Sequence, residues 1–144
     1  MRLAFKRLDP GATLPRYAHE GDAALDLAAN GDVLVGPGER ALVPTGFAVA
    51  IPDGFAGLVL PRSGLASKHG LTLANAPGLV DSGYRGEIMI AVVNLDPREK
   101  VEIQKGDRIA QLLIVPHASV EPVEVDELPS SGRGEGGFGS TGVN

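Results

Sequence analysis

Apolar residues along the chain occur in short runs that glycine and proline interrupt. Of the 144 residues, 20 are glycine and 11 are proline, and their spacing leaves little room for helices of ordinary length. We therefore expect short strands at residues 3–8, 41–43, 47–51, 57–60, 71–74, 87–94, 101–103, 108–115 and 120–125. Many short strands separated by turn signals are typical of a sandwich, a jelly roll or a barrel.

Two segments refine this picture. Residues 63–69 predict one short helix, because Arg62 and Ser63 stand where a helix can begin and Gly70 stands where helices commonly end. Residues 87–94 are apolar on both faces of the expected strand, so both faces need a cover. The core covers one face, and either a second subunit or the protein's own interior covers the other. We expect an oligomer, with a fully internal strand as the alternative.

The C-terminal residues follow a different pattern. Six of the eleven residues 132–142 are glycine, which contributes no side chain to a core. We therefore expect a body of residues 1–129 followed by a flexible glycine-rich arm of residues 130–144. Such tails are usually disordered linkers. The guanidinium of Arg133, the nearby hydroxyls and the ring of Phe138 favour a second interpretation, a lid that closes over a nucleotide.

Composition and charge exclude several classes of protein. The chain has no cysteine, which excludes disulfides and thiolate metal sites. Its formal net charge of −5 disfavours non-specific binding to a nucleic-acid backbone. No apolar stretch approaches the ~20 residues that a membrane helix requires. We expect a soluble cytoplasmic protein that binds neither nucleic acid nor membranes.

Several polar residues are candidates for chemistry. Arg62 and Ser63, at the start of the expected helix, suit a phosphate, although Ser63 fits ordinary N-capping equally well. Asn75 offers an amide that matches a base edge, but it is more often a turn residue. Asp81 can orient a water as general base, yet an aspartate before Ser-Gly usually forms a turn.

Two further polar residues lie in apolar surroundings. Asp26 is flanked by Leu25 and Leu27, and Gln111 lies within the apolar segment 108–113. Polar groups in such settings need partners, so each is either a satisfied core group or part of a site. Taken singly, each favours a structural role.

Together these segments resemble, in order, the five motifs of the homotrimeric dUTPase family, the deoxyuridine triphosphate nucleotidohydrolases. The matching segments are residues 24–27, 61–66, 78–87, 108–112 and 133–142. The third and fifth are highly specific, whereas in the first Ala24-Leu25 replaces the family's usual small-then-bulky pair before Asp26. The resemblance implies an all-β fold, a distorted jelly roll or β-barrel of short strands with one short helix and a mobile C-terminal arm. It also implies a homotrimer with active sites shared between subunits.

The resemblance further implies hydrolysis of dUTP to dUMP and pyrophosphate by in-line attack of water on the α-phosphorus. This reaction limits uracil incorporation into DNA and supplies dUMP for dTMP synthesis. By the same resemblance Asp81 activates the water, Asn75 reads uracil, and Tyr84 lies under the deoxyribose where a ribose 2′-hydroxyl would clash. The remaining residues of the implied base and sugar pocket are Leu79, Val80 and Met89.

Phosphate and metal contacts complete the implied site. A Mg²⁺ ion bridges the phosphates, and Asp26 acts at most through the water shell of that ion. The implied phosphate-binding residues are Arg62, Ser63, Gly64 and Gln111. In the arm, Phe138 stacks on uracil, and the implied γ-phosphate contacts are Arg133, Ser140 and Thr141. Gly139 is a further implied substrate-binding residue of the arm.

Two other functions compete with this interpretation. A dCTP deaminase of the same fold needs a glutamate beside the cytosine amine, and the segment 75–86 contains none; Glu87 follows it. A non-catalytic nucleotide-binding protein would not require Asp81, Tyr84, Arg133 and Phe138, all of which are present. The three histidines, His19, His69 and His117, lack metal-ligand spacing and receive no role.

Overall fold

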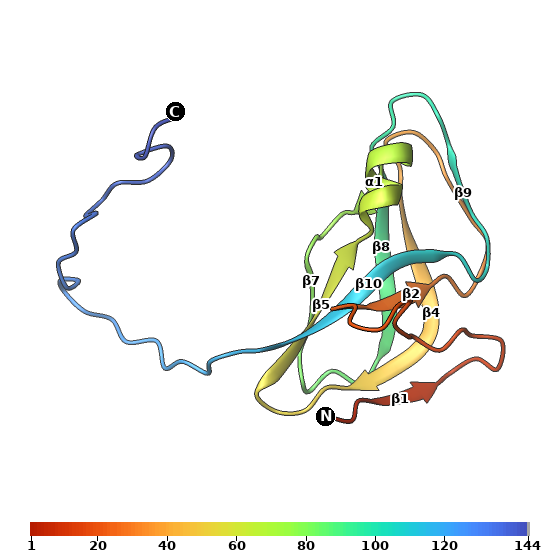
Figure 1. Cartoon of the computed structure of the whole chain (residues 1–144), viewed down its shortest axis with the longest axis horizontal. Helices are drawn as coiled ribbons and strands as arrows, with labels where there is room; N and C mark the ends of the chain where they lie inside the picture. Colours follow the sequence, from red (N-terminus) through yellow and green to blue (C-terminus); the bar gives the residue numbers. More distant parts are fainter. Residues whose placement is uncertain (144) are drawn as a thin grey trace.

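The computed structural model describes residues 1–143 and consists of short strands and one short helix (Figure 1). The strands are β1 (Ala4–Arg7), β2 (Leu25–Ala28), β3 (Val33–Val35), β4 (Arg40–Ala50), β5 (Phe55–Pro61), β6 (Leu71–Leu73), β7 (Gly78–Val80), β8 (Glu87–Asn94), β9 (Val101–Ile103) and β10 (Arg108–Pro116). The helix α1 (Ser63–His69) follows β5 directly. This architecture confirms the predicted all-β class and the single short helix.

The strands form two four-stranded antiparallel sheets and one isolated pair. One sheet has the order β1-β4-β8-β6, the other has the order β2-β10-β5-β7, and β3 pairs with β9. Their arrangement is jelly-roll-like, and the sheets are not closed into a barrel. Neighbouring strands are often distant in sequence, as with β2 and β10, so the sheet brings far-apart segments side by side.

The core lies between the inner faces of the sheets. Its most completely buried side chains come from both sheets: Leu27, Val43, Phe47, Ile90, Val92 and Leu112. In β8 burial alternates, so that Ile88, Ile90 and Val92 face this core. Met89 and the residues on the same side of β8 remain half-buried. The second apolar face of this strand is therefore only partly covered within the chain.

The helix forms where the local signals predict it. The residue before its first turn is Arg62, whose side chain makes no capping hydrogen bond, so Ser63 is not the N-cap. Gly70 ends the helix in the left-handed conformation, with φ 69°, and its N–H donates to the last-turn carbonyls. Within residues 1–143 no helix is long and apolar enough to cross a bilayer.

The strand predictions differ from the structure in three respects. The segments 41–43 and 47–51 form one strand, β4, because a bulge between Pro44 and Ala48 absorbs the break in the apolar pattern. The short strands β2, β3 and β7 were missed, although the equally short β1, β6 and β9 were predicted. The strand expected at 120–125 is absent, because no sheet edge lies beside this segment.

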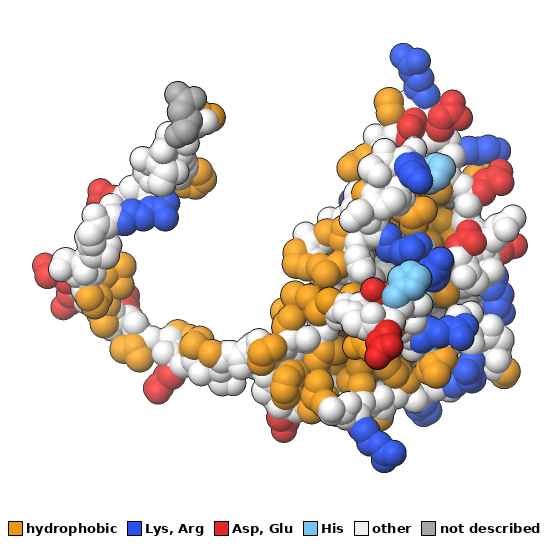
Figure 2. All heavy atoms as spheres, in the orientation of Figure 1, with side chains coloured by type: hydrophobic (Ala, Val, Ile, Leu, Met, Phe, Trp, Pro, Cys, Tyr) orange, Lys and Arg blue, Asp and Glu red, His pale blue; other side chains and the backbone are white. Residues whose placement is uncertain are grey.

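The chain leaves the body after β10. His117 N–H donates to the Gly54 carbonyl at 3.0 Å, and from there to residue 143 the chain has neither helix nor strand and every residue is exposed. Figure 2 shows this segment as a thin string that curves away from the body. The expected boundary between a body of residues 1–129 and an arm of residues 130–144 stays a prediction, and Asn144 lies outside the described residues.

Candidate active site

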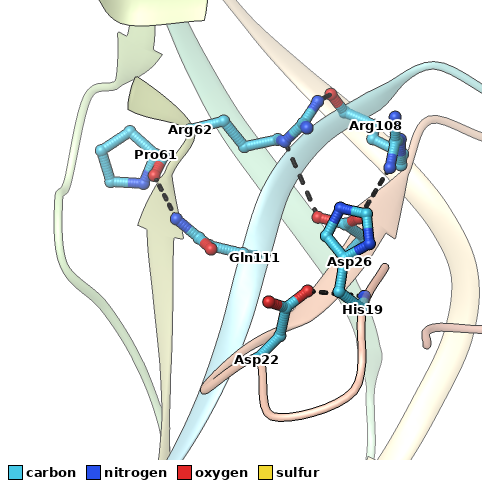
Figure 3. A network of polar contacts seen from close by, with 7 residues as sticks. All are labelled: His19, Asp22, Asp26, Pro61, Arg62, Arg108 and Gln111. Carbon is cyan, nitrogen blue, oxygen red and sulfur yellow. Dashed lines mark hydrogen bonds and ion pairs between the residues drawn. The ribbon is translucent and has the colours of Figure 1, made fainter. Parts of the chain in front are cut away.

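A polar cluster forms where β2, β10 and the start of α1 meet (Figure 3). Asp26 on β2 has a side chain that is only 14% exposed, and it lies between two arginines. Arg108 Nη1 is 3.1 Å from Asp26 Oδ2, and Arg62 Nε is 3.7 Å from Asp26 Oδ1. Arg62 Nη1 also donates to the Arg108 carbonyl at 2.9 Å. Asp26 thus has two cationic partners, although its neighbours in sequence are apolar. The ion pairs with Asp26 hold both guanidinium groups in place.

This cluster forms one wall of a hollow of about 510 Å³, here called the anion hollow. Ser63 and Gly64 at the start of α1 line it, and both are exposed. Gln111 lines it from β10, and its Nε2 donates to the Pro61 carbonyl at 2.9 Å. Arg62 and Arg108 bring two guanidinium groups to the hollow, and the carboxylates of Asp22 and Asp26 line it as well. The guanidinium N–H groups that do not bond to Asp26 or to the backbone can donate to an anionic ligand.

A second cavity, here called the base pocket, has a volume of about 200 Å³. The loop between β6 and β7, strand β7 itself and the start of β8 form its walls. The sequence-predicted residues that line it are Asn75, Leu79, Val80, Asp81, Tyr84 and Met89. Val80 is buried, whereas the Leu79 side chain is 65% exposed. One small pocket thus combines an amide, a carboxylate, a phenol and apolar walls.

Asp81 and Tyr84 are held in a tight turn on the rim of the base pocket. Tyr84 N–H donates to the Asp81 carbonyl at 3.1 Å. The Tyr84 hydroxyl donates to the Glu87 carbonyl at 2.8 Å. In the described part of the chain no side chain bonds to the Asp81 carboxylate, which is exposed to solvent. Such a carboxylate can accept a proton from a water molecule.

The two hollows have no lining residue in common. The group around Asp26 and the group around Asp81 are therefore not brought into one cavity by a single chain. The predicted arm residues join neither group. Phe138 is fully exposed, and Arg133 Nε donates only to the nearby Gly136 carbonyl, at 2.6 Å. The hydrogen bond from Ser140 N–H to the Gly137 carbonyl is equally local.

Sequence reasoning missed several residues of the anion hollow, of which Arg108 matters most. Arg108 was included in a motif but was given no role, yet it makes the shorter of the two contacts with Asp26. The available signal was the position of Arg108 as the charged first residue of a strand in which Gln111 is the one other polar residue. His19 also lines this hollow, and its backbone N–H donates to Asp22 Oδ2 at 2.8 Å.

Comparisons with known proteins agree with this geometry. The family model described as dUTPase matches residues 11–142. A deoxyuridine 5'-triphosphate nucleotidohydrolase of Thermobifida fusca is 58% identical over 142 residues, which are 99% of this chain and 79% of that protein. The enzyme of the same name from Mycobacterium bovis BCG is 56% identical over 145 residues, covering 97% of this chain and 94% of that protein.

Solved structures give the same result. The dUTPase of Staphylococcus bacteriophage 80alpha with dUpNHpp has a TM-score of 0.90 at 36% identity, with 99% of both chains covered. A dUTPase mutant from phage phi11 of S. aureus, whose structure concerns the coordination of a structural Mg(II) ion, has a TM-score of 0.84 at 30% identity, covering 90% of this chain and 100% of that chain. The resemblance seen in the sequence is confirmed, and the chain belongs to the dUTPase family of nucleotidohydrolases.

Proposed function

We propose that this chain hydrolyses dUTP to dUMP and pyrophosphate in a Mg²⁺-dependent reaction, by in-line attack of water on the α-phosphorus. Hydrolysis of dUTP itself follows from membership of the family. The observation that carries the finer proposal is the base pocket, which has Asn75, Asp81 and Tyr84 on one small cavity. Its volume of about 200 Å³ suits a base and a sugar rather than a whole triphosphate.

Within the base pocket each residue type has a distinct task. The Asn75 amide offers one donor and one acceptor, which matches the edge of uracil. Leu79, Val80 and Met89 supply apolar walls for the base and sugar. The Tyr84 ring lies under the deoxyribose and leaves no room for a 2′-hydroxyl, so that UTP is rejected by steric exclusion.

Asp81 is the proposed general base. Its carboxylate is exposed at the rim of the pocket, so a water molecule can bind between it and the α-phosphorus. Asp81 takes a proton from that water as the oxygen attacks phosphorus, and the bond to the pyrophosphate oxygen breaks on the opposite side. The products are dUMP and pyrophosphate.

The anion hollow is the proposed phosphate site. Arg62, Ser63, Gly64 and Gln111 donate to phosphate oxygens there. Within residues 1–143 no cluster of three or more acidic or histidine side chains exists that could hold a metal by itself. Asp26 would hold a Mg²⁺ only through the water shell of the ion, and the substrate phosphates would bind the ion itself. When bound, the ion neutralises charge on the phosphates.

The arm is proposed to close over the bound nucleotide. The hydrogen bonds of residues 130–143 are local, so closure does not disrupt the body. Phe138 stacks on uracil, the groups proposed to hold the γ-phosphate are Arg133, Ser140 and Thr141, and Gly139 is a further proposed substrate-binding residue. Closure removes water from the reacting phosphates.

A homotrimer with shared active sites accounts for the separation of the two hollows. The anion hollow of one subunit and the base pocket of another then form one site, and the arm of a subunit reaches its neighbour. The half-covered apolar face of β8 and the exposed Leu42 and Leu79 are surfaces that such an assembly would bury. In the cell the enzyme limits uracil incorporation into DNA and supplies dUMP for dTMP synthesis.

Pyrophosphate release tests the proposal. The purified protein is given dUTP with Mg²⁺, beside UTP, dCTP and dTTP at equal concentration, and with excess chelator as control. We expect release from dUTP alone and loss of release with chelator. Binding of dUTP without turnover would instead favour a non-catalytic nucleotide-binding protein, and ammonia release from dCTP would favour a deaminase.

A further inference from the structure

We propose that Glu87 is a positioning residue that sets the place of the Tyr84 ring, and thereby the discrimination between deoxyribose and ribose. This inference rests on the proposed function of the base pocket. Glu87 is among the residues that line the base pocket, but the role proposed here runs through its contacts with the protein and not through a contact with the substrate. It acts through two contacts, one made by its backbone carbonyl and one made by its carboxylate.

The first contact places the phenol. The Tyr84 hydroxyl donates to the Glu87 carbonyl at 2.8 Å, which folds the side chain back over the intervening backbone. The ring lies directly against Gly86, because a Cβ added there would be 2.5 Å from Tyr84 Oη and 2.7 Å from Cζ. Tyr84 is 45% exposed, so this hydrogen bond and this close approach are what hold the ring.

The second contact places the carbonyl that the phenol uses. Glu87 Oε1 accepts a hydrogen bond from Gly46 N–H at 2.8 Å. Gly46 lies within the bulge of β4, where the register with β8 shifts between the pairs Pro44–Met89 and Ala48–Glu87. The Glu87 carboxylate therefore accepts a hydrogen bond from the Gly46 N–H, which has no partner in the regular hydrogen-bond ladder between β4 and β8.

The bulge to which Glu87 bonds is itself tightly held. Gly46 has φ +74°, and a Cβ there would be 2.5 Å from the Ala12 Cβ, so only glycine fits. The buried Thr45 hydroxyl donates to the Ile88 carbonyl at 2.7 Å, next to the Glu87 contact. The start of β8 is thus anchored to β4 at two consecutive residues, and Tyr84 is anchored to the start of β8.

Steric exclusion of a 2′-hydroxyl depends on this chain of contacts. A ring that excludes one oxygen atom must be fixed to a fraction of an ångström, and a half-exposed phenol is free to rotate unless its hydroxyl is bound. Removing the Glu87 carboxylate takes away one of the two anchors at the start of β8 and leaves the acceptor carbonyl less firmly held. The ring then gains freedom, and ribose becomes better tolerated.

The test compares Glu87→Ala with Glu87→Gln, whose amide oxygen can still accept from Gly46 N–H. The readout is the ratio of kcat/KM for dUTP to that for UTP. We expect Glu87→Ala to lower this ratio about 2- to 10-fold, which is the effect of one hydrogen bond. We expect Glu87→Gln to keep the ratio of the unaltered protein. Glu39→Ala is the matched control, because Glu39 also accepts from a glycine N–H, that of Gly36 at 2.9 Å, near the opposite end of the β4–β8 pair.

A ligand-free measurement tests the position of the ring directly. The chain has two tyrosines and no tryptophan, so Tyr17→Phe assigns the ring NMR signals of Tyr84. We expect Glu87→Ala to shift the Tyr84 signals and leave those of Tyr17 in place. Gly86→Ala, which forces the ring outward without touching the Glu87 carboxylate, is expected to shift the same signals and lower the same ratio. Gly31→Ala, in open space, is its control.

Unchanged Tyr84 signals and an unchanged dUTP-to-UTP ratio in Glu87→Ala would overturn the inference. If that variant does not fold, an unchanged ratio in Gly86→Ala overturns the inference, because the position of the Tyr84 ring then does not set the discrimination. Loss of activity towards both nucleotides by the same factor would indicate a general structural role and also contradicts it. Failure of the unaltered protein to hydrolyse dUTP is a different result, since it contradicts the proposed function while the NMR comparison still tests the positioning.

Discussion

Asp26 shows how one residue acquires a role from its neighbours. Alone it is a carboxylate in an apolar strand, but in the fold it lies between Arg62 and Arg108 at 3.7 and 3.1 Å. It therefore both fixes the guanidinium groups of the anion hollow and remains available at 14% side-chain exposure. A carboxylate in this position can bind the water shell of a metal without binding the metal directly.

Removing the charge of Asp26 tests that role. Asp26→Asn is expected to raise the Mg²⁺ concentration required for half-maximal pyrophosphate release by about tenfold, because an amide attracts hydrated Mg²⁺ more weakly. A Mg²⁺ titration of the initial rate measures this, with Asp53→Asn, on an exposed turn, as control. An unaltered titration would remove Asp26 from the proposed metal site.

Asp81 is the residue on which the proposed chemistry depends. Asp81→Asn keeps the size of the side chain and removes the base, so turnover is expected to fall by about 10²- to 10⁴-fold with little change in nucleotide binding. Steady-state kinetics and an equilibrium titration with dUTP separate the two effects. Near-normal turnover in this variant would assign the base elsewhere.

At the scale of elements, turns carry much of the local order. The turn between β8 and β9 is organised by Asp96, whose Oδ1 accepts from Glu99 N–H at 2.7 Å and from Arg98 N–H at 2.8 Å. These bonds hold the pKa of the Asp96 carboxyl below its ordinary value of 3.8. The sequence already indicated a turn here, through Asp96-Pro97.

The lowered pKa has a consequence for stability. A carboxyl whose pKa is lower in the folded chain stabilises it above the unfolded pKa, and the contribution is lost as pH falls through the folded value. Asp96→Ala should therefore lower Tm at pH 7, and the difference should shrink as pH falls below 3.8. Thermal unfolding followed by circular dichroism at pH 7 and at a pH below 3.8 measures this difference. Asp126→Ala, in the exposed segment after β10, is the control. If the difference in Tm between the unaltered protein and Asp96→Ala does not depend on pH, the stabilisation does not come from the ionised Asp96 carboxylate.

At the scale of the whole molecule, the protein has a packed body and a segment outside it. The last described hydrogen bond between them is that of His117 with Gly54, and beyond it the described chain makes only local bonds. Figure 1 shows this segment leading away from the sheets. Folding of the body and closure of the site are therefore separable. In the proposed trimer, the arm completes a site that the body alone leaves open.

Deletion of residues 130–144 tests this separation. We expect turnover of dUTP to fall by about 100-fold, because the phosphates are no longer clasped and shielded, while Tm is unchanged. Kinetics and thermal unfolding of the truncated chain are compared with those of Glu135→Gln, which alters the charge of the arm alone. A large loss of Tm would mean that the arm belongs to the packed structure.

Much of the fold was predictable because its signals are local. Glycine and proline spacing predicted short strands, and Gly70 predicted the end of α1, since each acts on its own backbone. The prediction of a strand at 120–125 was wrong because a strand also requires a partner, which is not a local property. An alternating apolar pattern becomes a strand only where a partner edge is available, and the pattern says nothing about partners.

The sequence by itself determined the all-β class, the one helix and, through five ordered motifs, the family. The tertiary structure decided which distant groups meet. Asp26 and Arg108 are 82 residues apart and touch only because β2 pairs with β10. The Glu87 carboxylate meets Gly46 only because β4 carries a bulge opposite β8. Local pattern encodes periodicity and turns, whereas strand pairing depends on the packing of the whole chain, and that packing defines the two hollows.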